Sequence, residues 1–203
     1  MTASFTRAQL LSRGAKGGAT LLVAGGALAG FADAAPAAAD PLPLGDLAYA
    51  RLLVGTELLA ADFYSQAVAA SNTGKLVSSY LERAYLNEQE HYQSVAGIPS
   101  GAGAAPAVAA DFVFSYPAGT FASQGAIVRF ARQLEATMLG AYLGAVGGMQ
   151  TDSFKAGLAE IAACEAQHSA YFTTALGGKA FDLSFPPPLT MEQTSNVLDA
   201  YTS

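Results

Sequence analysis

The sequence predicts an all-α protein, a four-helix bundle of two helical hairpins joined by a long crossover, with a short extra helix at the C-terminus. Two observations lead to this prediction. Four long segments repeat apolar side chains at the spacing of one helix face, and no segment shows the alternation of a half-buried strand. The connections within each pair of segments are short, whereas a Gly-, Ala- and Pro-rich stretch over residues 99–122 separates the pairs. Short links within pairs and one long link between them are typical of a bundle with a single crossover.

Composition narrows the class of protein further. Of 203 residues, 52% are apolar and 13% are charged, and this balance excludes an intrinsically disordered chain. The single cysteine, Cys164, excludes a disulfide scaffold and is expected to be a small buried side chain. A formal charge of −6 disfavours nucleic acid and anionic lipid as partners, since both carry negative charge themselves.

Residues 1–39 are expected to be a secretory signal peptide that precedes a single domain over residues 40–203. Basic residues precede an uncharged stretch at 17–32, and small residues then suit cleavage after Ala39, with Ala34 as the alternative site. The stretch is too short and too rich in Gly and Ala for a membrane span, which needs about 20 strongly apolar residues. We therefore expect export by a twin-arginine-like or general route to the periplasm, the cell envelope or the extracellular space, with no stable membrane span after cleavage.

The first predicted hairpin consists of helices over about residues 46–71 and 75–95. Asp46 can cap the first helix, and the Asn-Thr-Gly turn at 72–74 ends it. The Gly-Ile-Pro sequence at 97–99 is expected to stop the second helix, because a proline inside a helix removes a hydrogen bond and clashes with the preceding turn.

The second predicted hairpin follows the crossover, in which residues 108–116 are expected to add a short extended piece. Its first helix covers about residues 124–146 and stops at a Gly-Gly pair. Its second helix follows an Asp152 cap and reaches Leu176, before another Gly-Gly pair.

The predicted bundle thus spans about residues 46–178 and leaves a C-terminal tail over residues 179–203. Three prolines at 186–188 favour an extended start of this tail. Thr190 and Gln193 then have the spacing of a capping box, which predicts the short fifth helix.

An internal repeat relates the two hairpins. Each carries a glutamate on its first helix and, 31 or 30 residues later, a Glu-x-x-His on its second helix. The six residues are Glu57, Glu88 and His91 in the first hairpin and Glu135, Glu165 and His168 in the second. They occupy otherwise apolar stripes, where an unpaired charge would be costly.

The spacing of these residues predicts a dinuclear metal site. Residues three apart on a helix are neighbours on one face, so each Glu-x-x-His offers an oxygen and a nitrogen to one centre. Two glutamates plus two Glu-x-x-His motifs are the ligand pattern of di-metal carboxylate bundles, with two iron ions expected and manganese as the alternative. The other interpretation is a set of buried polar residues that merely pair with one another.

Tyr64 and Tyr142 repeat in the same way, each seven residues after the glutamate of its helix. Packing in the core is one explanation for them. The alternative is a functional role beside the metals, either as a redox relay or as a hydrogen-bond donor to a ligand carboxylate.

These motifs resemble the ferritin-like superfamily of di-iron carboxylate bundles, and they are most similar to its exported, desiccation-related branch. The resemblance covers about residues 44–178, and the PPPLTMEQTSNVLDAY tail is similar to the end of that branch. It implies that the six repeated residues are metal ligands and that the chain is an oxidoreductase of ferroxidase or peroxidase type, with Fe(II) and oxygen or peroxide as partners.

Two alternatives to this function stay open. One is a non-catalytic envelope protein that protects against stress or desiccation and holds its metals only for structure. The other is peroxide disproportionation of the manganese catalase type, which uses the same ligand set. The sequence also leaves open whether copies of the chain assemble into a homo-oligomer.

Overall fold

Five α-helices make up most of the computed structural model, which describes residues 41–180 and 183–202. They are α2 (Leu44–Ala69), α3 (Lys75–Gly101), α4 (Gln124–Gly148), α5 (Asp152–Ala175) and α6 (Met191–Tyr201), and a 3₁₀ turn, η2 (Ala109–Asp111), lies in the crossover. No strand forms within the described ranges, so the all-α prediction is confirmed. The expected signal peptide, residues 1–39, lies outside the described residues and stays a prediction.

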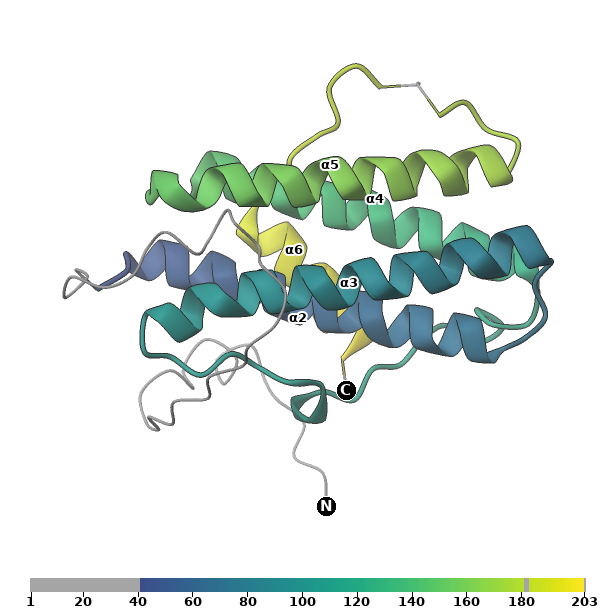
Figure 1. The fold of residues 1–203 in the computed structure, drawn as a ribbon, viewed down its shortest axis with the longest axis horizontal. Helices are drawn as coiled ribbons and strands as arrows, with labels where there is room; N and C mark the ends of the chain where they lie inside the picture. The colour runs from purple at the N-terminus through teal and green to yellow at the C-terminus, as the bar shows by residue number, and fades with distance from the viewer. Residues whose placement is uncertain (1–40, 181–182, 203) are drawn as a thin grey trace.

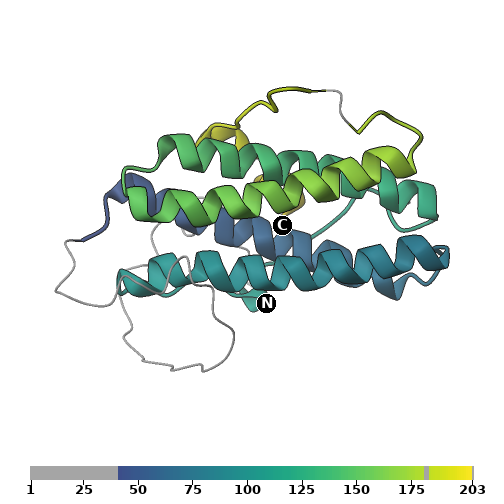
Figure 2. The same ribbon diagram turned by 45° about the horizontal axis from the view of Figure 1, so that its top comes forward.

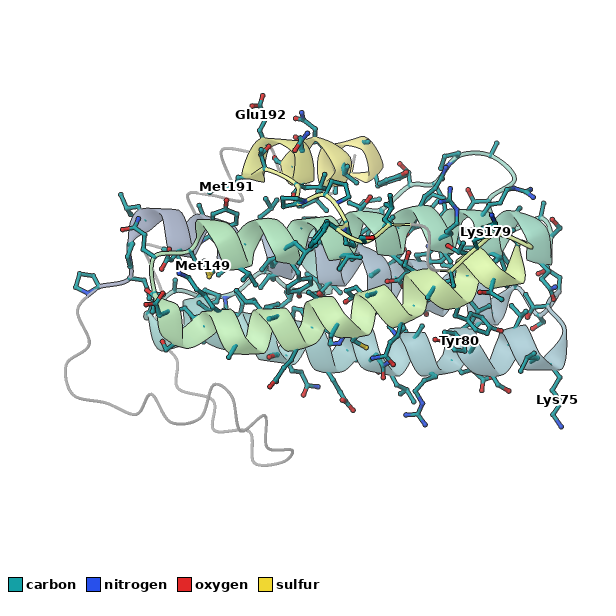
Figure 3. The ribbon with its side chains drawn as sticks, turned by 90° about the horizontal axis from the view of Figure 1, so that it is seen from above. Lys75, Tyr80, Met149, Lys179, Met191 and Glu192 are labelled. Carbon is teal, nitrogen blue, oxygen red and sulfur yellow. The ribbon has the colours of Figure 1, made fainter. Side chains whose placement is uncertain are left out.

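The four long helices form a bundle of two hairpins, as the connectivity predicted. α2 packs along α3 and α4 packs along α5, and Figure 1 shows the second hairpin above the first. The same layering is visible when the molecule is turned in Figure 2. In Figure 3, α6 lies beside α4 on the side away from α5, and it also contacts α2. The short final helix therefore covers one side of the bundle instead of lengthening it.

Apolar side chains from all four long helices fill the interior. The largest fully buried ones include Phe63, Leu81, Met138 and Phe172, one from each long helix. Burying a side chain of this size contributes about 1.5–3 kcal/mol, so this core provides the main stabilisation of the bundle. Among the helices that the structure describes, none is long and apolar enough to cross a bilayer.

Asp46 lies inside α2 and does not cap it, contrary to expectation. The helix begins at Leu44 after Pro43, whose restricted φ suits the start of a helix. The Asp46 carboxylate is fully buried and accepts the backbone N–H groups of Gln150 and Thr151, each at 2.8 Å. Burial alone would raise the pKa of Asp46, but these hydrogen bonds outweigh it and lower the pKa. Asp46 therefore ties α2 to the turn that precedes α5.

α3 continues through Pro99 and ends at Gly101, so the expected stop at 97–99 is wrong. The proline has no N–H to donate and costs α3 one hydrogen bond. That loss falls in the last turn, where the carbonyl groups of Ile98 and Pro99 still accept from Ala102. Because Ile98 and Pro99 are also buried, packing keeps this segment helical.

The second hairpin begins and ends close to the predicted positions. α4 starts after Ser123, whose hydroxyl accepts the N–H of Ala126, and it ends at Gly148, two residues beyond the expected end. α5 starts with Asp152 as its first residue, so Thr151 takes the capping position that we expected for Asp152. The Asp152 carboxylate still favours the helix, because negative charge in the first turn complements the helix dipole.

The crossover and the C-terminal tail meet at the end of α6. The extended piece expected over 108–116 is largely replaced by η2 and reduced to one antiparallel bridge between Phe114 and Thr202. α6 begins with the predicted capping box, in which the side chains of Thr190 and Gln193 each accept the other residue's backbone N–H. That prediction is confirmed.

Two glycines on α4 allow the tail to contact the helix backbone. The N–H of Leu189 donates to the carbonyl of Gly140 at 2.8 Å. A Cβ atom at Gly144 would lie 1.9 Å from the carbonyl oxygen of Leu189. Only glycine fits this position without displacing the segment that leads into α6.

Candidate metal centre

Six ionisable side chains meet between the four long helices, and they are the six that the repeat predicts. They are Glu57 on α2, Glu88 and His91 on α3, Glu135 on α4, and Glu165 and His168 on α5. The four glutamates are 0% exposed, and the two histidines are at most 9% exposed. The apolar stripe of each helix carries these side chains inward together with its core residues.

The six side chains form two groups of four, each compact enough to hold a metal ion. Within each group the candidate ligand atoms lie within 4.8 Å of one another. Glu88 and Glu165 belong to both groups. Glu57 and His91 complete the first group, which is named here the His91 position. Glu135 and His168 complete the second group, which is named the His168 position. The two positions are therefore adjacent and share two carboxylates.

Glu88 and Glu165 each direct one carboxylate oxygen toward each histidine. Oε2 of Glu88 lies 3.4 Å from Nδ1 of His91, and its Oε1 lies 3.2 Å from Nδ1 of His168. For Glu165, Oε1 lies 2.9 Å from Nδ1 of His91 and Oε2 lies 3.3 Å from Nδ1 of His168. This is the arrangement of two carboxylates that bridge two neighbouring positions.

Glu57 and Glu135 each serve one position, and a tyrosine from the other hairpin holds each of them. Tyr142 of α4 donates its hydroxyl hydrogen to Oε1 of Glu57, and Tyr64 of α2 donates to Oε1 of Glu135. The other oxygen of Glu57 lies 3.9 Å from Nδ1 of His91. Both tyrosines are fully buried, so each is a core side chain and also a donor to a candidate ligand. Their role as a redox relay stays a hypothesis.

Most of the buried polar atoms that lack a hydrogen bond gather at this site. Among the described residues, nine buried side-chain nitrogen or oxygen atoms lack a hydrogen-bond partner, and eight belong to the six candidate ligands. They include Nδ1 of both histidines, which lies 2.9 Å from Oε1 of Glu165 in His91 and 3.2 Å from Oε1 of Glu88 in His168. A buried polar group without a partner costs about 1–3 kcal/mol. Oxygen and imidazole nitrogen atoms converging in this way fit divalent metal ions.

Three of the four carboxyl groups of the site have strongly shifted pKa values. Burial, together with the charge of Glu88, raises the pKa of Glu57 well above its usual range. Burial and the charge of Glu165 raise the pKa of Glu135 in the same way. Burial also opposes the ionisation of Glu165, but contacts with both imidazoles outweigh it and lower its pKa to about 2. Burial and the neighbouring charges therefore shift the pKa values of adjacent carboxyl groups in opposite directions.

Both imidazoles of the site have raised pKa values. Burial alone would lower the pKa of His91 and of His168. The contacts with Cys164 and with the surrounding carboxylates outweigh burial and raise both pKa values well above the usual range. The surrounding carboxylates therefore favour the charged form of both imidazoles, because an opposite charge nearby stabilises an ionised group.

Two side chains that sequence reasoning did not assign to the site contact Nε2 of His168, the nitrogen that faces away from the glutamates. The side-chain amide of Asn87 lies 3.0 Å from this nitrogen, and Sγ of Cys164 lies 3.6 Å from it. Cys164 is partly exposed, so the expectation of a small buried side chain is wrong. Asn87 and Cys164 stand immediately before Glu88 and Glu165, at equivalent places in the repeat, and that symmetry was the available signal.

Aromatic rings cover the His168 position from the end of the bundle near Lys75. Tyr80, labelled in Figure 3, lies edge-on to His168 with a centroid distance of 6.3 Å. It also contacts Phe172, on which Tyr64 stacks with a centroid distance of 6.2 Å. These rings leave His168 only 2% exposed and exclude bulk water from its surroundings.

Comparison with known proteins agrees with this fold and this site. A family model described as a ferritin-like domain matches residues 45–178, which include nearly all of the four long helices and all six candidate ligands. No curated protein matches the sequence.

Proposed function

Because this chain belongs to the ferritin-like domain family, we propose that it binds two iron ions inside the bundle and oxidises Fe(II) with oxygen or peroxide. The observation that carries the proposal is the convergence of eight unpartnered buried atoms from Glu57, Glu88, His91, Glu135, Glu165 and His168. Four ionised carboxylates would balance the charge of two divalent ions, so a loaded site would bury little net charge.

The ligand set suits iron. Carboxylate oxygens and imidazole nitrogens are ligands that Fe(II) and Mn(II) share, whereas a zinc site of the structural kind uses thiolates and four ligands. The bound metals would supply the one-electron steps between Fe(II) and the oxidant. The chain's own contribution is to arrange and desolvate the ligands.

Each of the chain's residues has a definite task in this proposal. Glu88 and Glu165 present one oxygen to each position and so hold the two positions next to each other. Tyr142 fixes the carboxylate of Glu57 by its hydrogen bond, which leaves the second oxygen of that carboxylate toward His91. Burial of all these groups strengthens their electrostatic interaction with a cation.

Titration of the purified protein with Fe(II) in air tests this function. We expect a ferric absorbance band that saturates at about two iron ions per chain, followed by further turnover when more Fe(II) is added. Glu88→Ala and His168→Ala should abolish the band. Glu90→Ala, an exposed glutamate on the same helix, is the matched control and should behave as the unaltered protein. No band in the unaltered protein, or the same band in Glu88→Ala, would overturn the proposal.

The native metal distinguishes iron oxidation from its manganese alternative. We propose iron, and elemental analysis of the protein purified from its native host tests that choice. If manganese is the main metal, the proposed reaction would be peroxide disproportionation and not Fe(II) oxidation. Stable metal binding without turnover would instead support a protective protein whose metals are structural.

We also propose that the mature protein is exported. The basic, uncharged and small-residue segments over 1–39 support this part of the proposal. N-terminal sequencing of the protein recovered outside the cytoplasm should begin at Asp40. Recovery of the chain only from the cytoplasm, with its first residues intact, would contradict export.

A further inference from the structure

The contact between Asn87 and His168 links the two hairpins immediately outside the metal centre. Asn87 lies on α3, one residue before Glu88. Its side-chain Nδ2 lies 3.0 Å from Nε2 of His168 on α5 and 3.5 Å from Sγ of Cys164. Nδ1 of the same imidazole points the other way, to within 3.2–3.4 Å of Glu88, Glu135 and Glu165. The imidazole of His168 therefore lies between the carboxylates on its inner side and the amide on its outer side.

The direction of the imidazole determines which amide atom must face it. If Nδ1 of His168 binds a metal, a neutral imidazole carries its hydrogen on Nε2. A protonated imidazole also carries a hydrogen on Nε2. In both cases Nε2–H is a donor and needs an acceptor, and Oδ1 is the only end of the Asn87 amide that can accept a hydrogen bond. The two ends of an amide have nearly the same shape, so a half-turn of the amide brings Oδ1 to the place of Nδ2.

We infer that Asn87 is a positioning residue for the metal centre: its Oδ1 accepts the hydrogen of His168 Nε2, which keeps Nδ1 of that histidine directed at the His168 position. This inference rests on the proposed function, because it assigns a partner to one of its ligands. A hydrogen bond to the outer nitrogen fixes the orientation and the tautomer of a ligating histidine and makes it a better ligand.

The repeat makes the two positions unequal. The residue that corresponds to Asn87 in the second hairpin is Cys164, one residue before Glu165. A thiol is a much weaker hydrogen-bond acceptor than an amide oxygen, and Cys164 is also partly exposed. Sγ of Cys164 lies 3.6 Å from Nε2 of His168, so both of these repeat-related residues lie against the same imidazole. We therefore expect the ion at the His168 position to bind with a different affinity from the ion at the His91 position.

Nuclear magnetic resonance can observe this hydrogen bond directly, because the chain contains two histidines. The untagged protein, labelled with ¹⁵N-histidine and loaded with Zn(II) as a diamagnetic probe, should show both imidazoles bound through Nδ1. The Nε2–H signal of His168, assigned from its loss in His168→Gln, should exchange with water at least about tenfold more slowly than the signal of His91. Equal exchange rates, or a His168 imidazole bound through Nε2, would overturn the inference without any Asn87 variant.

Variants at Asn87 provide the second measurement. Asn87→Leu keeps the volume of the side chain but cannot accept a hydrogen bond. In competition with a chelator, this variant should bind one of its two Zn(II) ions with an affinity lower by about 10–100-fold. Asn87→Asp retains an acceptor and should retain the affinity. Gln89→Leu, which removes an exposed amide bonded to Tyr85 on the same helix, is the control and should change neither ion.

The outcomes separate the inference from the proposed function. If the unaltered protein binds no Zn(II) and no Fe(II), the proposed function fails and this inference fails with it. If it binds both ions but Asn87→Leu binds them equally well, the inference alone is overturned. If Asn87→Leu does not fold, the Asn87→Asp affinity and the exchange rate of the unaltered protein still decide.

Discussion

Filling both positions with divalent ions should release up to about four protons per chain near pH 7, one from each group whose pKa is raised. The raised pKa values favour the protonated carboxyl groups of Glu57 and Glu135 and the charged form of each imidazole. A carboxylate oxygen or an imidazole nitrogen must give up its proton to bind a metal. Glu165, with a pKa of about 2, has no proton to contribute at neutral pH.

The number of protons determines how steeply metal affinity depends on pH. Each proton released on binding changes the binding free energy by about 1.36 kcal/mol per pH unit. If all four protons are released, the summed binding free energy of the two ions should become more favourable by up to about 5 kcal/mol for each pH unit between pH 6 and pH 8. An exchange of four protons for two divalent ions would also leave the buried charge unchanged, which favours binding at a buried site.

Isothermal titration calorimetry with Mn(II) measures this exchange, because Mn(II) stays divalent during the experiment. Comparing the binding heats in two buffers of different ionisation enthalpy gives the number of protons released. Glu135→Gln cannot release a proton from that position and should lower the number by about one. Glu160→Gln replaces an exposed carboxylate on α5 and should leave the number unchanged. Release of fewer than two protons by the unaltered protein, or an affinity that is constant from pH 6 to pH 8, would refute the reasoning.

Three further predictions follow from the same structure. The buried glutamates and histidines with raised pKa values contribute stability that is fully present below the pKa values of the unfolded chain and is lost as pH rises through the pKa values of the folded protein. The protein without bound metal should therefore have a lower melting temperature at pH 9 than at pH 6. A higher melting temperature at pH 9 would contradict this. Gly144→Ala places a methyl group against the Leu189 carbonyl and should lower the free energy of unfolding by about 1–3 kcal/mol. Gly147 has open space around it, so Gly147→Ala should raise the free energy of unfolding by about 0.5–1 kcal/mol. Equal effects of the two substitutions in urea denaturation would refute the contact. Tyr142→Phe leaves the Glu57 carboxylate without its donor and should weaken metal binding about tenfold in chelator competition, and an unchanged affinity would show that the hydrogen bond does not position the ligand.

Local spacing explains why the ligand candidates were predictable from the sequence. Glu88 and His91 are three residues apart, so they face the same side of α3 whatever lies around that helix. The apolar residues of the same stripe then direct both side chains into the core. The equivalent pattern on α5 follows from the same rule, and so does the assignment of the bundle to a ferritin-like fold.

Helix ends were less predictable, because they depend on contacts with other elements. Asp46 has the side chain of a good cap, but its carboxylate binds backbone N–H groups of the turn before α5. Pro99 is a helix breaker in isolation, but burial and the hydrogen bonds that close the last turn keep it in α3. A propensity describes one residue in its own segment, and tertiary contacts of a few kcal/mol are enough to override it.

The sequence by itself determined which side chains face the interior and which chemical groups they bring, because the period of a helix determines the face on which each residue lies. Only the tertiary structure decided which carboxylates are shared between the two positions, which tyrosine holds which glutamate, and that Asn87 contacts His168. These contacts cross from one hairpin to the other. They depend on the rotation and the axial offset of each helix relative to its neighbours. Packing of the whole core determines these two quantities, and residue spacing along a single helix carries no information about them.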